Sequence, residues 1–219
     1  MVRPSGSEVA AATVRRGPAA RARRRRAAIA AARDVFVAHG YQGANMAEIS
    51  ALAGMSKPVL YEHFTSKLDL YLTVLQQDLD RMVAGVRAAL TADTGYRDRV
   101  RRAVLVSFDF VEDATGGHLL VFESAVPSEP AVQWRVGTAM RECAVLVSAE
   151  IRAVGVTALQ ADTYAWGLVG ASHHAARDWL DAGKPLAKSE AVDSVVALFW
   201  SGLSILGADR IHLSRTGSS

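Results

Sequence analysis

Apolar residues recur at helical spacing along almost the whole chain. Ile29, Ala32 and Phe36 share one stripe of a segment that begins at Arg21, and Gly40 would end this helix. Gly and Pro separate further segments with the same spacing, which span 66–90, 97–113, 117–126, 130–154, 159–182 and 189–206. No alternation of apolar and polar residues is long enough for a strand, so the pattern predicts an all-α fold.

A short helix is predicted between the first two long ones. Asn45 would cap it, and Glu48 three residues later completes the pattern of a capping box. Ile49 and Leu52 would face inward, and Gly54 would end the helix.

A second short helix would follow directly. Ser56 would cap it, and Pro58 falls in its first turn, where a missing N–H is tolerated. Leu60 and Phe64 lie four residues apart and share the inner face. Three polar side chains are left for the outer face: Lys57, Tyr61 and His63. The two short helices and the AGMS turn between them predict a helix-turn-helix, whose second helix presents its outer face to the major groove of DNA.

The charge is unevenly distributed along the chain. Residues 1–67 hold 11 Arg and Lys against 4 Asp and Glu, whereas the whole chain holds 25 against 22. A basic N-terminal part can bind phosphates by releasing their counterions. Like charges crowded at the start of the first helix are unfavourable unless an anion relieves them. We therefore expect four arginines to contact DNA phosphates or an adjacent minor groove: Arg23, Arg24, Arg25 and Arg26.

Composition argues against several classes of protein. Cys143 is the only cysteine, so neither a disulfide framework nor a thiolate metal site is expected, and a reducing, cytoplasmic setting fits. No apolar run reaches the roughly 18 residues that a membrane helix needs, and no secretory signal is expected at the N-terminus. We expect disordered tails at 1–20 and 211–219.

The stretch from Arg33 to Leu72 contains a helix, a GY turn, AEISALAGMSKPVLYEHF and SKLDLYL. In order and spacing it resembles the N-terminal domain of the tetracycline-repressor (TetR) family. The resemblance implies a three-helix DNA-binding head at 21–67, a helical ligand-binding and dimerisation body at 68–210, and a homodimer on a palindromic operator.

The resemblance also implies roles for individual residues. The recognition-helix candidates are Ser56, Lys57, Val59, Tyr61 and His63. The residues expected to approach the DNA backbone are Tyr41, Asn45 and Met46. Lys67 would meet a phosphate at the N-terminus of the long helix, where the helix dipole favours an anion.

The middle helices predict a pocket for an apolar ligand, because they combine apolar and aromatic residues with few charges. The candidates are Val104, Phe108, Val111, Leu119, Leu120, Phe122, Trp134 and Met140. The stretches FESAVPSEPAVQWRVGTAM and GLVGASHHAARDWLDAGKPLAKSEAV resemble actinobacterial TetR-family regulators of fatty-acid synthase genes. Such regulators respond to long-chain acyl-CoA and can activate as well as repress. The resemblance implies an acyl-CoA effector, with Arg135 or Arg141 either near the CoA phosphates or simply solvated.

The last two helical segments are the least charged part of the chain, and they combine tryptophans with small residues. Such helices need to be covered, and a two-fold four-helix interface with a second copy would cover them. The alternative is that they form the interior of one body. The residues assigned to the interface are Trp166, Gly170, His173, His174, Arg177 and Trp200.

Two other functions remain open. His173, His174 and Asp178, with Glu123 or Glu142, could form the metal site of an enzyme, although adjacent histidines point about 100° apart on a helix. The sequence has no Gly-rich phosphate loop, nucleophile elbow or HExxH motif, so neither enzymatic activity nor a cofactor is predicted. The other alternative is a carrier of apolar ligands whose basic head binds membranes or RNA. Its first helix lacks the bulky apolar residues of a membrane-binding helix.

Overall fold

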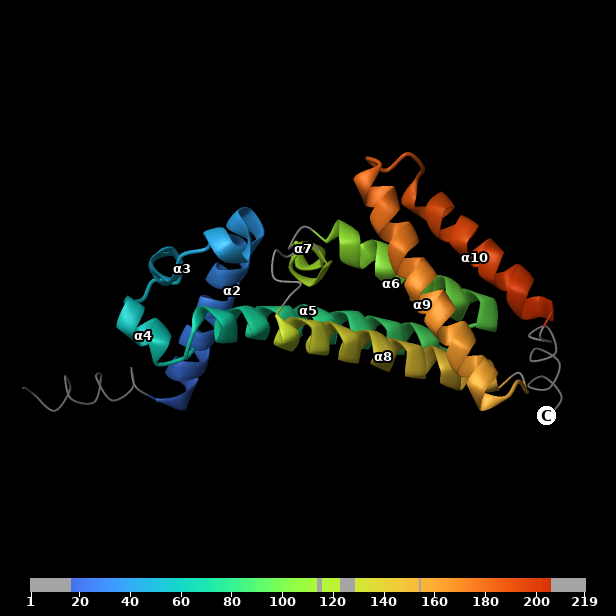
Figure 1. The fold of residues 1–219 in the computed structure, drawn as a ribbon, viewed down its shortest axis with the longest axis horizontal. Helices are drawn as coiled ribbons and strands as arrows, with labels where there is room; N and C mark the ends of the chain where they lie inside the picture. Colours follow the sequence, from blue (N-terminus) through green and yellow to red (C-terminus); the bar gives the residue numbers. More distant parts are fainter. Residues whose placement is uncertain (1–16, 114–115, 123–128, 154, 206–219) are drawn as a thin grey trace, which may run out of the picture. The chain divides into compact units, whose positions relative to one another are not determined.

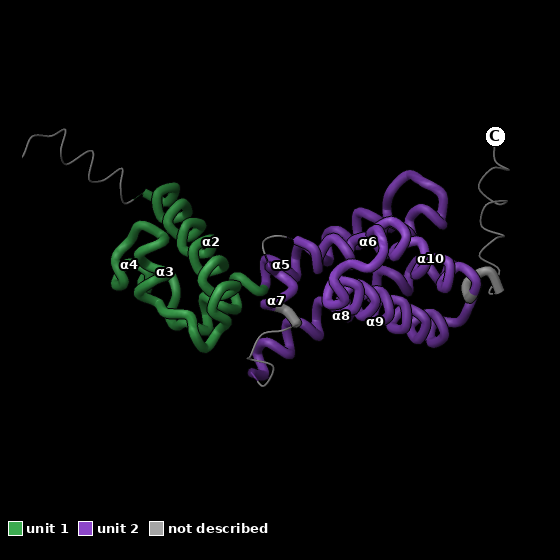
Figure 2. Tube along the Cα trace, turned by 90° about the horizontal axis from the view of Figure 1, so that it is seen from above, with its two compact units in different colours: residues 1–75, 124–126 green, residues 76–123, 127–219 purple. Residues whose placement is uncertain are grey.

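The computed structural model describes residues 17–113, 116–122, 129–153 and 155–205, and these residues are helical without any strand (Figure 1). The all-α prediction is therefore confirmed. The predicted C-terminal tail and most of the predicted N-terminal tail lie outside the described residues. The chain divides into two compact units, and the change from one to the other falls between Leu75 and Gln76 (Figure 2).

The first unit contains three helices and the start of a fourth. They are α2 (Pro18–Gly43), α3 (Met46–Leu52), α4 (Lys57–Tyr61) and the first residues of α5 (Lys67–Leu90). The first helix begins at Pro18 rather than at the predicted Arg21, since proline suits the first helical turn. Its backbone leaves the helical region at Gly40, where φ is 64°, as the predicted stop requires.

Aromatic rings join α2 to the start of α5. The Phe36 and Tyr71 rings meet edge to face with centroids 5.1 Å apart, and both side chains are fully buried. Leu70 and Val74 are buried with them. The head therefore extends to Leu75 and includes the first turns of α5, beyond the boundary predicted after Lys67.

The short helices are held by the apolar anchors that the sequence predicts, with one exception. Ile49, Leu60 and Phe64 are fully buried. Leu52, predicted to face inward, is 59% exposed. The buried stripe of α3 consists of Met46, Ile49 and Ser50, and at 100° per residue this stripe turns Leu52 outward.

The second unit contains the rest of α5 and five further helices. They are α6 (Tyr96–Glu112), α7 (Gly117–Phe122), α8 (Pro130–Arg152), α9 (Ala158–Asp181) and α10 (Lys188–Ile205). α9 packs against α8 and also contacts α6 and α10 (Figure 1). An ion pair of 2.8 Å between Arg87 and Glu142 joins α5 to α8.

The core of this unit joins α6, α9 and α10. Phe108 of α6 packs against Trp179 of α9, with ring centroids 5.4 Å apart, and Phe199 of α10 belongs to the same buried cluster. The Trp179 indole N–H donates to the Leu186 carbonyl at 2.9 Å. Trp179 thus belongs to the interior of one chain. This agrees with the alternative prediction that the last two helical segments form the interior of one body.

The start of α7 is packed against a buried carboxylate on α5. Asp78 is fully buried and accepts a hydrogen bond from Arg81, which also donates to Asp113 at 3.2 Å. A Cβ placed on Gly117 would lie 3.0 Å from Cγ of Asp78. This close approach favours glycine at that position, and the contacts of Asp78 and Arg81 bring α5, α7 and the residue after α6 together.

Candidate nucleic-acid interface and ligand pocket

A tight turn separates α3 from α4. Gly54 has a φ of 65°, in the left-handed region that glycine adopts without steric cost. The N–H of Gly54 donates to the Ala51 carbonyl at 3.1 Å, and that of Met55 donates to the Ser50 carbonyl at 3.0 Å. The AGMS stretch thus forms a hydrogen-bonded turn between two short helices, as the sequence predicts.

The predicted caps are formed only in part. Asn45 Oδ1 accepts from the N–H of Ala47 at 2.8 Å, so this residue caps α3. Glu48 does not close the capping box, because its carboxylate lies 3.3 Å from Nε2 of His39 on α2. Ser56 occupies the N-cap position of α4, but its side chain makes no capping hydrogen bond there.

The outer face of α4 is polar and accessible. Tyr61 is 43% exposed, and Ser56 and Lys57 are exposed, whereas Val59 and His63 are partly buried. Partial burial and the charges of nearby arginines, Arg21 foremost, lower the pKa of His63. At neutral pH this imidazole is therefore an uncharged donor and acceptor in a basic environment.

The four arginines of α2 that were predicted to contact DNA are all exposed, but they are not equivalent. The guanidinium carbon of Arg25 lies 5.0 Å from the centroid of the Phe64 ring, within the range of a cation–π contact. Arg25 thus braces α2 against the residue that anchors α4. Arg23, Arg24 and Arg26 form an exposed cationic surface on the same turns.

Lys67 and Tyr41 are in contact with each other. The Lys67 ammonium donates to the carbonyls of Ala44 at 3.1 Å and Gln42 at 3.3 Å, and lies 4.6 Å from the Tyr41 ring centroid. Tyr41 also meets the Tyr71 ring at 5.1 Å. Two of the three ammonium hydrogens are thus used inside the head, where the sequence predicted a phosphate contact.

Met46, also predicted to approach the DNA backbone, does not present its side chain at the surface. Its side chain is buried on the inner stripe of α3, so only its main chain is available to DNA. Asn45, next to it, is exposed while it caps the helix.

Replacing Lys67 by methionine is expected to lower the free energy of unfolding of the head by about 1–2 kcal/mol, because a cation–π contact and two charged hydrogen bonds are lost. Urea unfolding measures this change. The matched variant Lys57→Met removes an exposed ammonium and should leave stability unchanged while flattening the salt dependence of DNA binding. If Lys67→Met instead flattened that dependence at full stability, Lys67 would be a phosphate contact rather than a brace.

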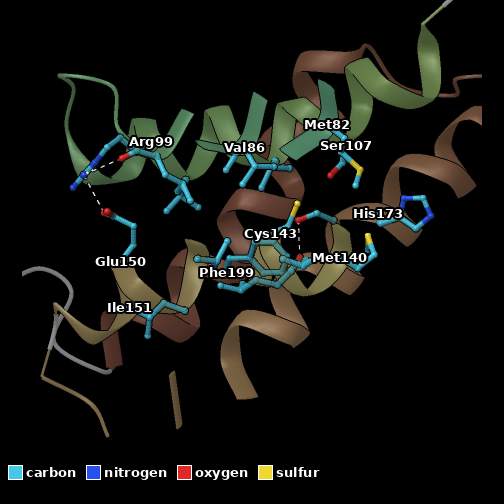
Figure 3. A pocket seen from close by; sticks show the side chains of 18 of the residues that line it. Met82, Val86, Arg99, Ser107, Met140, Cys143, Glu150, Ile151, His173 and Phe199 are labelled. Atoms are coloured by element: carbon cyan, nitrogen blue, oxygen red, sulfur yellow. Dashed lines mark hydrogen bonds and ion pairs between the residues drawn. The ribbon is translucent and has the colours of Figure 1, made fainter. Parts of the chain in front are cut away.

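The second unit contains an apolar cavity of about 60 Å³ that is partly open to solvent. Side chains from α5, α6, α8, α9 and α10 line it, among them Met82, Val86, Cys143 and Phe199 (Figure 3). Arg99 and Glu150 lie at one end and His173 at the other (Figure 3). The cavity is therefore a largely hydrophobic site with polar groups at its ends, as ligand pockets commonly are.

Two of the eight predicted pocket residues, Val104 and Met140, line this cavity. Phe108 and Val111 belong instead to the core around Trp179, and Trp134 is 68% exposed on α8. Leu119 and Leu120 lie on α7 away from the lining, and the side chain of Phe122 lies outside the described residues.

Two titratable groups in the cavity wall, the side chains of His173 and Cys143, are uncharged at neutral pH. Burial lowers the pKa of His173 to about 4, assisted by the charges of His174 and Arg177. Burial raises the pKa of the Cys143 thiol to about 11. These two groups therefore present no charge to a ligand.

The residues assigned to a dimer interface are divided between interior and surface. His173 is buried at the cavity, and Trp200 is half-buried against the Tyr96 ring with centroids 6.0 Å apart. Trp166 is 47% exposed, and His174 is also exposed. Gly170 is half-buried, and Arg177 pairs with Asp181 at 3.5 Å.

The described residues contain no group of three His, Cys, Asp or Glu side chains placed to hold a metal ion. The His173 and His174 rings have centroids 5.7 Å apart, and Glu123 lies outside the described residues. Within the described part of the chain, no helix is long and apolar enough to cross a membrane.

A short exposed helix held behind a tight turn is the geometry with which helix-turn-helix proteins enter the major groove. Residues 28–74 match the family of bacterial regulatory proteins called the tetR family. The chain is 46% identical over 182 residues to the HTH-type transcriptional activator FasR of Mycolicibacterium smegmatis, covering 83% of each protein. These findings define a DNA-binding transcriptional regulator. The chain belongs to the tetR family, and the predicted family and the predicted role as a DNA-binding transcriptional regulator are confirmed.

Solved structures agree with this assignment. A TetR-like transcriptional regulator from Rhodococcus sp. RHA1 matches with a TM-score of 0.66 at 26% identity, covering 83% of this chain and 96% of that one. FadR from Bacillus subtilis, solved in complex with stearoyl-CoA, matches with a TM-score of 0.64 at 14% identity, covering 80% and 97%. At that identity the second match shows the fold alone. The relatives are regulators, so the prediction that the protein is no enzyme is confirmed as well.

Proposed function

We propose that the protein is a homodimeric regulator whose affinity for a palindromic operator changes when a long-chain acyl-CoA enters the cavity of the second unit. The observation that carries the proposal is an apolar cavity lined partly by α5, the helix that also belongs to the DNA-binding head. FasR, with 46% identity, and FadR, solved with stearoyl-CoA, support the choice of effector. A regulator that binds chromosomal DNA in a bacterium acts in the cytoplasm.

The proposed DNA contacts lie on two surfaces of the head. The outer face of α4 would read the major groove with its exposed and half-exposed side chains: Ser56, Lys57, Val59, Tyr61 and His63. The exposed arginines of α2 would meet phosphates, with Arg25 acting chiefly as a brace. Asn45 and Tyr41 would approach the backbone near the start of α3.

The proposed dimer surface is the outward face of α9 and α10. Trp166 is 47% exposed and Leu198 is 70% exposed, and a second copy packed on this face would cover these large apolar side chains. A Cβ at Gly167 or Gly170 would meet no described atom within 4 Å, so the α9 backbone is open to close approach. A second copy of the chain fits this face, because two half-sites about one helical turn apart require two heads.

The size of the cavity suggests how a ligand would act. A volume of about 60 Å³ is smaller than a long acyl chain, so such a ligand would either extend beyond the cavity or move the helices around it apart. Met82, Val86 and Leu90 of α5 line the cavity, while Lys67 of the same helix is bonded to residues 42 and 44. A ligand that prefers one placement of α5 would shift the population of the DNA-binding state.

Palmitoyl-CoA is expected to change the affinity for operator DNA at least about tenfold, which takes only about 1.4 kcal/mol of differential binding. Fluorescence anisotropy on a duplex selected from genomic fragments measures the change, and calorimetry measures binding of the ligand itself. CoA alone is the ligand control, and Ala103→Leu, which fills the cavity wall, should abolish the response in a folded protein. No heat and an unchanged operator affinity with palmitoyl-CoA would refute the proposed effector.

A further inference from the structure

One side chain of the cavity wall carries a buried donor that no described residue accepts from. Arg99, on the first turns of α6, has a side chain only 13% exposed. Its Nη1 donates to the Leu90 carbonyl at 3.1 Å and lies 3.0 Å from Oε2 of Glu150. Its Nε is buried without an acceptor among the described residues. A buried N–H left in this way is unfavourable, so an oxygen acceptor that reaches Nε when a ligand opens this end of the cavity would be stabilising.

The charge at this end of the cavity is already balanced. Arg99 and Glu150 form an ion pair and both line the cavity, where Figure 3 shows them together at one end. The neighbouring wall is formed by Leu90, Tyr96 and Ile151. Burial, and then the charge of Glu150, raise the pKa of the Tyr96 hydroxyl, as expected for a poorly hydrated site.

This balance decides what kind of acceptor fits. A ligand carboxylate would add a negative charge beside Glu150 without a cation to match it, and burying an unmatched charge is strongly unfavourable. An uncharged oxygen has lone pairs for the Arg99 N–H and brings no such penalty.

We infer that this end of the cavity recognises an uncharged oxygen acceptor on the apolar ligand, such as an ester or thioester carbonyl, with Arg99 as the donor and Glu150 excluding carboxylates. The inference rests on the proposed function, because it names the part of the ligand that the cavity selects. A long-chain acyl thioester carries such an oxygen at the head of its chain. A free fatty acid, ionised at neutral pH, does not.

Three probes of similar length separate the contributions: methyl decanoate, decanoate and tridecane. Displacement of an apolar fluorescent dye from the full-length protein at pH 7.5 measures their relative affinities. The wild type is expected to bind methyl decanoate roughly tenfold more tightly than either other probe, since one hydrogen bond to a charged donor is gained without burying an extra charge. Equal affinity for methyl decanoate and tridecane would overturn the inference.

Two variants test the charge argument. Glu150→Gln keeps the size of the side chain and leaves Arg99 uncompensated, so decanoate should now bind at least as tightly as methyl decanoate. The double variant R99M/E150Q removes the donor while keeping the wall uncharged, and the three probes should then differ by no more than about threefold. An unchanged preference in Glu150→Gln would also overturn the inference.

These outcomes are distinguishable from failure of the proposed function. If the wild type binds the probes without discriminating among them, the cavity still takes apolar ligands and only the head-group assignment is wrong. If no probe binds and palmitoyl-CoA has no effect on operator binding, both the assignment and the proposed effector are wrong.

Discussion

Replacing Lys57 and Tyr61 together by alanine is expected to weaken binding to the selected operator about a hundredfold or more, because each lost base or phosphate contact contributes about 1–3 kcal/mol. Both side chains point away from the core, and Tyr61 is 43% exposed. The anchors Leu60 and Phe64 are fully buried and remain in place, so the fold should persist. Anisotropy titration of the duplex measures the affinity, and circular dichroism verifies the helices.

The matched control on the same short helix is Glu62→Gln. This exposed residue caps the end of α4, and the change alters the charge by one unit, as Lys57→Ala does, but in the opposite direction. Binding should be retained or slightly strengthened, since removal of a negative charge favours DNA. If the double variant bound the operator within about threefold of the wild type, α4 would not be the recognition helix, because a single direct contact is worth more than that.

Replacing Asp78 by alanine is expected to lower the free energy of unfolding by about 2 kcal/mol or more, because the charged hydrogen bond between Arg81 and this fully buried carboxylate is lost. Arg81, whose pKa is raised chiefly by its hydrogen bond to Asp78, would keep only Asp113 of its two described carboxylate partners. In a chain of this size the melting temperature should fall by several degrees, at about 2–4 °C per kcal/mol. Calorimetric melting measures it.

A double-mutant cycle with Gly117 tests the reason for this effect. Gly117→Ala alone should be destabilising, because its Cβ would lie 3.0 Å from Cγ of Asp78. In the Asp78→Ala background that contact is gone, so the added methyl group should be nearly neutral. Strict additivity of the two changes would mean that Asp78 and the start of α7 are not coupled. Asp78→Asn, which keeps the volume, separates the loss of charge from the loss of packing.

The helix-turn-helix was predictable because its signals are local. Gly54 in the left-handed region, Asn45 as a cap and Pro58 in a first turn each act within a few residues, and the structure has all three. The inner anchors Leu60 and Phe64 follow from a spacing of one helical turn. The prediction that Leu52 faces inward was wrong, although it relied on the same helical spacing. With only seven residues, α3 offers too few positions to define its buried stripe from sequence.

The apolar cavity could be predicted only as a region. Val104 and Met140 were found because apolar residues on the middle helices have few other roles, but Phe108 shares the same stripe and packs on Trp179 instead. Arg99 and Glu150 gave no sequence signal, since charged residues on amphipathic helices are usually solvated. Their pairing across α6 and α8 depends on which faces of those helices meet.

By itself, the sequence determined the helices, their order, the turn between α3 and α4, and the family, because helical spacing, glycine and proline act over distances of a few residues. Only the tertiary structure decided that Lys67 is bonded to residues 42 and 44, that Trp179 is interior, and that five helices line a cavity with Arg99 at one end. Those contacts join segments far apart in the chain. Which face of one helix meets another is set by packing of the whole unit, and local periodicity does not predict it.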